Sequence, residues 1–227
     1  MPLHALRISR RIEIVLIKRY LQLKRGDLVC DIGSGDGYWT KRLAAEAKIV
    51  GIDIDTPSLQ GAQQNGKTAN TQYLQASATD MPFADATFDK LFGVCSVEHI
   101  LENEKAFSEF ARCTKPGGVV VLTLDSLSDP RTTDEQRKEH HERYYTPHLY
   151  DLPYAKECLE KAGLKLTDHT FIISSPISSR LYSVFDRVRR LQYVLFPVAY
   201  PLIRISDAIW GSRTHGWKLA VRAVKPA

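Results

Sequence analysis

The stretch that decides the fold is Val29–Gly37, which reads Val-Cys-Asp-Ile-Gly-Ser-Gly-Asp-Gly. A short apolar run over 28–30 leads into an acidic residue, Asp31, and then into three glycines that alternate with other residues. A helical pattern follows from Trp39 onward. Glycines at this spacing let the backbone turn sharply out of a strand and let a ligand approach the main chain closely. The stretch therefore predicts a strand, a ligand-binding turn and a helix.

The order of residues in this turn distinguishes two kinds of ligand. A dinucleotide site usually has the spacing G-x-G-x-x-G, whereas this chain has D-x-G-x-G-x-G. The carboxylate of Asp31 at the end of the strand disfavours a phosphate there. It suits a cationic group or an amine instead.

Composition is typical of a globular α/β protein. The chain has 227 residues, 44% of them hydrophobic and 25% charged, which is within the range of a single large domain. The net charge of +5 does not by itself indicate a nucleic-acid partner. Arginines at 7, 10 and 11 interrupt any signal-peptide core, and the longest uncharged run, 191–203, is too short to span a bilayer. Four cysteines lie far apart, without a C-x-x-C pair, and we interpret them as reduced core residues of a cytoplasmic protein: Cys30, Cys95, Cys113 and Cys158.

Strand-like and helix-like segments alternate in the first half of the chain. The predicted strands are 28–33, 49–54, 72–76, 88–95 and 119–124, and the predicted helices are 37–47, 57–65 and 103–114. This alternation predicts an α/β fold, with a parallel sheet covered by helices on both faces. Ligands of such sheets bind beyond the carboxyl ends of the strands, where the glycine turn lies.

The pattern changes after the fifth strand. Residues 125–150 are polar and rich in histidine and tyrosine, and they are predicted to be a long loop or lid. A helix at 153–162, a strand at 164–173 and a last strand at 217–224 follow. We predict one domain with four parts: an N-terminal helix (1–24), a core (25–174), a helical insertion (175–214) and the last strand (215–227).

Several further motifs agree with the glycine turn in order and spacing. They are Gly51-Ile52-Asp53-Ile54, the segment 80–89 (DMPFADATFD), Val97-Glu98-His99-Ile100 and Lys115-Pro116-Gly117-Gly118. Together they resemble the class I S-adenosylmethionine-dependent methyltransferases of the type 11 kind over about 25–175, plus the last strand. The resemblance implies a doubly wound, mostly parallel seven-stranded sheet with an antiparallel C-terminal strand, and S-adenosylmethionine as cofactor.

The resemblance also implies roles for individual residues. Asp31 approaches the amino group of the methionine portion of the cofactor, and the glycines pack beneath it. Asp53 accepts hydrogen bonds from both ribose hydroxyls. Many relatives carry an aspartate three residues before Asp80, and this chain has Ser77 there. The predicted cofactor-binding set is Asp31, Gly33, Gly35, Gly37, Asp53, Ile54, Ser77, Ala78, Thr79 and Cys95.

Two polar clusters are candidates for the reacting end of the site. The first is Glu98-His99, with His99 as a base or substrate contact, or simply a packed residue that Glu98 orients. The second is the lid segment 139–148, where His141 is a second candidate base. Residues predicted to face the substrate are Glu98, Arg143, Tyr144 and Tyr145. The histidine spacing in the lid does not match a zinc pattern such as H-E-x-x-H, so no metal is predicted.

The insertion 175–214 carries most of the net charge of the chain. Six arginines and two aspartates give +4, and they are interleaved with aromatic and aliphatic residues. Such a composition suits a membrane interface with anionic head groups. It also suits a helical cap with its own core or a dimer interface. We expect a substrate cap, with peripheral membrane contact through 180–210 as a further expectation.

The favoured function is methyl transfer to a small-molecule or lipid-linked acceptor, at oxygen or carbon rather than nitrogen. A nucleic-acid substrate is not expected, because the N-P-P-Y type of motif is absent after the fourth strand, where the chain reads Cys95-Ser96-Val97-Glu98. A catalytically degenerate binding or scaffold protein and a nicotinamide-dependent reductase are the alternatives. The sequence does not predict the acceptor or the oligomeric state.

Overall fold

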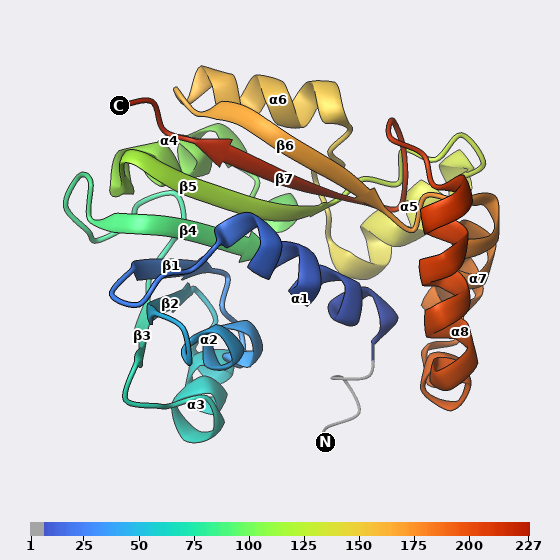
Figure 1. The fold of residues 1–227 in the computed structure, drawn as a ribbon, viewed down its shortest axis with the longest axis horizontal. Helices are drawn as coiled ribbons and strands as arrows, with labels where there is room; N and C mark the ends of the chain where they lie inside the picture. The colour runs from blue at the N-terminus through green and yellow to red at the C-terminus, as the bar shows by residue number, and fades with distance from the viewer. Residues whose placement is uncertain (1–6) are drawn as a thin grey trace.

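The computed structural model describes residues 7–227, without the side chains of Arg189 and Gln192. Figure 1 shows one continuous sheet with helices on both of its faces. The strands are β1 (Leu28–Ile32), β2 (Lys48–Asp53), β3 (Thr71–Gln75), β4 (Phe88–Val94), β5 (Thr114–Asp125), β6 (Lys165–Ile172) and β7 (Lys218–Val224). The helices are α1 (Ile8–Leu21), α2 (Tyr38–Leu43), α3 (Thr56–Asn65), the short 3-10 helix η2 (Val97–His99), α4 (Asn103–Cys113), α5 (Asp134–Tyr144), α6 (Leu152–Lys161), α7 (Pro176–Arg187) and α8 (Arg189–Trp210).

The sheet has seven strands in the order β3-β2-β1-β4-β5-β7-β6. Strands β1 to β5 are parallel, and β7 runs antiparallel between β5 and β6. The predicted fold class is therefore confirmed, including the antiparallel last strand. The order reverses between β1 and β4, and the turn after β1 lies at this switch point, where ligands of such sheets bind.

Two apolar clusters hold the layers together. One joins α1, α2 and the insertion to one face of the sheet, and the other joins α4 and α6 to the opposite face. The central strands are buried on both faces, as β1 shows with four buried residues out of five. Continuous apolar strands are the expected consequence of covering both faces with helices.

The segment 125–150 is not a long loop, as predicted, because it contains helix α5. This helix has no apolar stripe, so hydrophobic periodicity could not reveal it. A reciprocal capping box between Thr133 and Gln136 begins the helix, with Gln136 N donating to Thr133 Oγ1 at 3.2 Å. Two other boundaries also differ: α2 ends at Leu43, and β5 begins at Thr114 rather than after Gly118.

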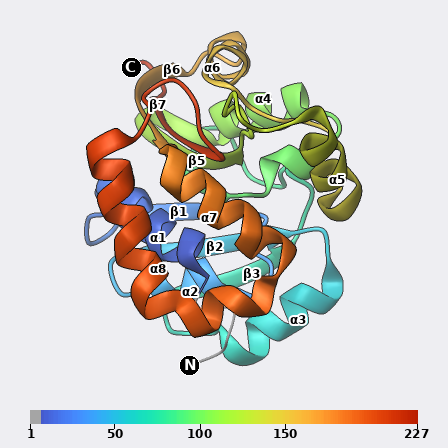
Figure 2. The same ribbon diagram turned by 90° about the vertical axis from the view of Figure 1, so that its right-hand side faces the viewer.

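The insertion forms the helical pair α7 and α8, which stands beside the amino-terminal half of α1 (Figure 2). Asp207 on α8 joins this helical pair to the segment that follows β6. Its carboxylate accepts hydrogen bonds from the backbone N–H groups of Ile173 (2.9 Å), Ser174 (3.2 Å) and Ser175 (3.0 Å) at the start of α7. Across residues 7–227, no helix combines the length and apolar character that a membrane span requires.

Candidate functional site

The glycine turn after β1 has the backbone that its sequence predicts. Gly33, Gly35 and Gly37 have φ angles of +67°, +53° and +75°, which side chains of L-residues rarely adopt. A Cβ atom at Gly33 would lie 2.5 Å from the Cβ of Ser96, whereas one at Gly35 would meet no protein atom within 4 Å. Gly33 is therefore needed for packing, and Gly35 leaves an open space above the turn.

Two carboxylates flank this open space. Asp31 is buried, and its Oδ2 accepts a hydrogen bond from Thr40 at 2.5 Å, while its Oδ1 is buried without a partner. Burial, with a smaller effect from the charge of Asp53, raises the pKa of Asp31 to about 7. Asp53 Oδ2 accepts from the N–H of Gly35 at 2.8 Å, so the end of β2 lies directly beside the turn.

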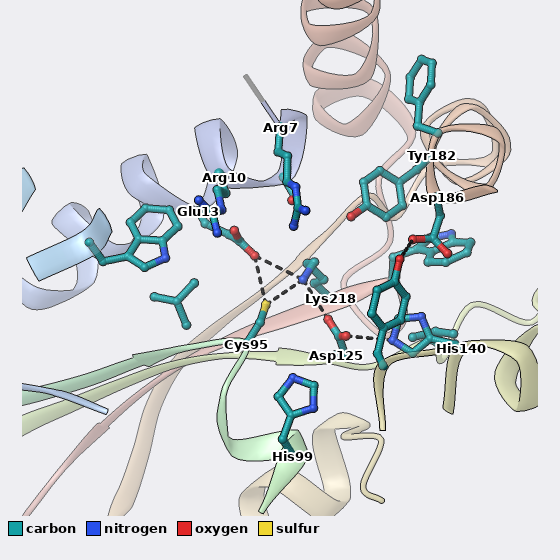
Figure 3. Close-up of a pocket in the computed structure, with 17 residues that line it drawn as sticks. Arg7, Arg10, Glu13, Cys95, His99, Asp125, His140, Tyr182, Asp186 and Lys218 are labelled. Atoms are coloured by element: carbon teal, nitrogen blue, oxygen red, sulfur yellow. Dashed lines mark hydrogen bonds and ion pairs between the residues drawn. The ribbon is translucent and has the colours of Figure 1, made fainter. Parts of the chain in front are cut away.

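A cavity of about 230 Å³ lies beyond the carboxyl ends of β4 and β5 (Figure 3). Helices α1, α2, α5 and α7 and the start of β7 complete its wall. Aromatic residues form much of this wall: Trp39, Tyr144, Tyr182, Phe185 and Trp217. The presence of Trp39 from α2 means that the cavity reaches the helix that follows the glycine turn.

Lys218 is the centre of a buried ionic cluster in this cavity. Its Nζ donates to Asp125 Oδ1 at 2.8 Å and to Cys95 Sγ at 2.7 Å, and it lies 3.4 Å from Glu13 Oε1. Burial alone would lower the pKa of Lys218, but the neighbouring Asp125, Cys95 and Glu13 raise it well above its ordinary value. Burial has the opposite effect on the Cys95 thiol and raises its pKa. This thiol donates to Glu13 Oε1 at 3.3 Å.

Asp125 also orients a histidine. His140 Nε2 lies 2.9 Å from Asp125 Oδ2, and His140 lines the cavity. Its other ring nitrogen, Nδ1, is buried and has no hydrogen-bond partner in the described part of the chain. Although burial would raise the pKa of Asp125, Lys218 and His140 hold it well below its ordinary range. An ionised Asp125 accepts the proton of Nε2, which leaves a lone pair on Nδ1.

Comparison with known proteins agrees with this architecture. The family model described as "Methyltransferase domain" matches residues 30–122, from the glycine turn to β5. The resemblance to the class I methyltransferases is thus confirmed over residues 30–122.

The relatives that match this chain are named for methyl transfer to different atoms. It is 29% identical over 154 residues to O-methyltransferase cnsE from Penicillium expansum, covering 65% of this chain and 55% of that protein. It is 28% identical over 154 residues to sterol 24-C-methyltransferase from Eremothecium gossypii, covering 62% and 41%. The chain thus spans about half the length of such relatives.

A solved structure shows the same fold. Phosphoethanolamine N-methyltransferase 2 from Haemonchus contortus, in complex with phosphomonomethylethanolamine and S-adenosylhomocysteine, superimposes with a TM-score of 0.72 at 22% identity. The alignment covers 96% of this chain and 53% of that one.

The glycine turn of this chain fits the S-adenosylmethionine expected from its sequence. The unpartnered Oδ1 of Asp31 can accept from the ligand's ammonium group, and the space at Gly35 admits its chain. Asp53 stands at the end of β2, and the neighbouring Ile54 is 70% exposed, so its side chain is free to cover a purine ring. Past β3, half-buried Ser77, Ala78 and Thr79 form a tight turn in which Thr79 N donates to Ser77 Oγ at 3.1 Å.

Of the residues predicted at the reacting end, His99 and Tyr144 line the cavity and His141 does not. His99 Nδ1 donates to the carbonyl of Tyr145 at 2.9 Å, and its ring points toward the cavity (Figure 3). His141 instead lies outside, with its Nδ1 2.9 Å from the carbonyl of Thr146. The structure thus places His140, the adjacent residue, where the sequence suggested His141.

The other predicted substrate contacts also lie outside the cavity lining. Glu98 is fully buried, and its Oε1 accepts from Asp125 N at 3.2 Å. Arg143 donates to the carbonyl of Asp186 at 3.1 Å, and Tyr145 is 62% exposed at the end of α5. Cys95, predicted to contact the cofactor, lines the cavity and belongs to the Lys218 cluster.

Cys95, Glu98 and Asp125 place three potential metal-ligating atoms within 4.8 Å of one another. The ammonium group of Lys218 already donates to two of these residues. The cluster therefore contains its own counter-cation.

Sequence reasoning missed Glu13, Asp125, His140 and Lys218. One signal was available, because Asp125 ends a predicted strand, and the carboxyl ends of parallel strands form the ligand edge of such sheets. Lys218 gave no local signal, since its partners lie 93 and 123 residues earlier in the chain.

Proposed function

We propose that this chain transfers a methyl group from S-adenosylmethionine to a hydroxyl group of a small-molecule or lipid-linked acceptor held in the cavity. The observation that carries the proposal is the pair Asp125–His140 in the cavity wall, in which Nδ1 of His140 has no partner. A hydroxyl acceptor is a weak nucleophile and benefits from a base, whereas an amine needs only its lone pair.

When bound, the cofactor supplies an electrophilic methyl group on a sulfonium. Asp31 and Asp53 would hold its amino and ribose groups. His140 Nδ1 takes the proton that the acceptor hydroxyl loses when its oxygen receives the methyl group. Asp125 keeps the proton on Nε2 and stabilises the imidazolium that results. The aromatic walls exclude water and position the acceptor.

The α1 side of the cavity offers donors for a second polar group. Arg7 Nε and Arg10 Nη1 are buried with no hydrogen-bond partner among residues 7–227, and both residues line the cavity. Burial, and next the charge of Arg7, lowers the pKa of Arg10. A carboxylate or phosphate on the bound molecules would satisfy both guanidinium groups.

An acceptor that reacts at carbon is the second candidate, because removal of its proton can use the same base. The relatives include enzymes named for oxygen, carbon and nitrogen acceptors, so these names do not choose among them. The base in the cavity favours oxygen or carbon.

The test is transfer of labelled methyl from S-adenosylmethionine into cell extract that is then split into organic and aqueous phases. We expect labelled product from the wild type and a loss of at least about 100-fold in His140→Gln. Glutamine at this position retains a donor toward Asp125, so a purely structural role would be spared. His169→Gln, a histidine on β6 away from the cavity, is the matched control and should keep full activity.

Three outcomes contradict the proposal. Full activity in His140→Gln with loss in His99→Asn would move the base to His99, since asparagine keeps the donor toward Tyr145. Loss in His141→Gln alone would place the base outside the cavity. Tight binding of S-adenosylhomocysteine with no labelled product in either phase would favour the scaffold alternative.

A further inference from the structure

Helix α8 carries a continuous apolar stripe on its exposed side. Its members follow one another at intervals of four, four, three and four residues, so they share one face of the helix. Their exposed fractions are Val194 76%, Val198 68%, Leu202 43%, Ile205 57% and Ile209 61%. Trp210, 58% exposed, lies at the end of the helix.

This stripe is not the side of α8 that holds the helix in place. Ala199 and Ile203 are buried in the core cluster, and Phe196 and Tyr200 pack against that cluster. The helix therefore has one apolar face on the protein and a second apolar face that no described residue covers. A row of large apolar side chains of this kind marks an interaction surface.

The charges of the insertion limit what can cover the stripe. Arg190 and Arg204 on α8, and Arg180 on α7, form no ion pair with any of the described residues. Both acids of the helical pair are engaged: Asp207 binds the backbone at 173–175, and Asp186 accepts from Tyr144 at 2.8 Å. The surface is therefore apolar with an excess of positive charge.

We propose that the stripe on α8 and the arginines around it bind the surface of a membrane that contains anionic lipids. Apolar side chains of such a helix enter the boundary between head groups and acyl chains, arginines meet lipid phosphates, and tryptophan favours this interface. A second copy of the chain is a poorer match, because it would bring arginines together with no free acid on either helical pair.

The surface is linked to the cavity through α7. Tyr182 and Phe185 on this helix line the cavity, and α7 packs along α8 (Figure 2). A lipid-linked acceptor could therefore pass from the membrane to the cavity along one helical pair. This last step rests on the proposed function, whereas membrane binding itself does not.

The test is flotation of the full chain with vesicles of phosphatidylcholine alone or of equal parts phosphatidylcholine and phosphatidylglycerol. We expect binding to the anionic vesicles that weakens with salt. The variant Val194→Gln/Val198→Gln/Ile205→Gln should lower the partition coefficient at least tenfold. Arg190→Gln/Arg204→Gln should lower it about fivefold for each arginine.

The matched control is Val15→Gln/Leu101→Gln, which changes two exposed apolar residues outside the insertion and should bind as the wild type does. Binding of S-adenosylhomocysteine, measured on every variant, shows that the core is intact and reports separately on the proposed function. Absence of binding to anionic vesicles would overturn the proposal. So would a dimer in light scattering that the triple variant converts to monomer without any vesicle binding.

Discussion

Lys218 and Asp125 are direct partners across the antiparallel strands β7 and β5, and their side chains form a buried ion pair of 2.8 Å in the cavity wall. This pair sets the charge state of the site, because the same Asp125 holds His140. His140, the proposed base, and the ammonium group of Lys218 are thus held by one carboxylate.

Replacing Lys218 by methionine should destabilise the fold strongly. The substitution leaves Asp125 and Glu13 buried without their cation, and removal of one partner of a buried pair costs about 3–5 kcal/mol. Denaturant unfolding measures the loss. Lys105→Met, which removes an exposed ion pair with Glu102, should cost about 1 kcal/mol or less. Equal losses in the two variants would contradict the buried cluster.

Affinity for S-adenosylhomocysteine should rise as pH increases through about 7. Asp31 must be ionised to hold the ligand's ammonium group, and its pKa lies near that value. Stability without ligand should change in the opposite direction. A carboxyl group whose pKa is raised by folding contributes stability that is fully present below its unfolded pKa and is lost as pH rises from that value up to its folded pKa. Titration calorimetry of the wild type and Asp31→Asn tests this, and a pH slope that persists in the variant would show that another group is responsible.

Alanine at Gly35 should impair ligand binding more than folding. The φ of +53° predicts a backbone cost of about 1–2 kcal/mol, with no clash against protein atoms. Gly26 is the matched control, because it also has a positive φ (+102°) and open space around it, but lies before β1. Both variants should lose similar stability, while only Gly35→Ala should lose at least tenfold in affinity for S-adenosylhomocysteine. Similar affinity in both variants would mean that the ligand lies elsewhere.

Glu98 should make the fold less stable as pH rises toward about 8. Burial, and next the charge of Asp125, raises the pKa of Glu98 to about 8. The wild type should therefore lose stability as pH rises from the ordinary carboxyl range up to about 8, and Glu98→Gln, which keeps an acceptor for Asp125 N, should lose less. Unfolding free energies at several pH values measure the difference, with exposed Glu135→Gln expected to follow the wild type. A steeper loss in Glu98→Gln would contradict the assigned protonation.

The parts of the site that could be predicted are those that depend on neighbouring residues. Asp31 and the three glycines lie within one turn, and their backbone angles follow from that local sequence. Asp53 could be placed because each parallel strand brings its carboxyl end to the same edge.

The pairing of Asp125 with His140 and Lys218 could not be predicted, for two physical reasons. Helix α5 has no apolar face, so hydrophobic periodicity could not show which of His140 and His141 faces the protein. Lys218 meets Asp125 only through strand pairing between distant segments, and the register of that pairing is set by the assembled sheet.

The position of β7 has a consequence for the making of the protein. The last strand of the chain is an inner strand of the sheet, between β5 and β6, and it brings Lys218 to the cavity. During synthesis, chains begin to fold from the amino terminus. Until residues 218–224 leave the ribosome, β5 and β6 present unpaired edges and Asp125 lacks its cation. A nascent chain can complete its glycine turn early, but the wall of the cavity is complete only after residues 218–224 have emerged.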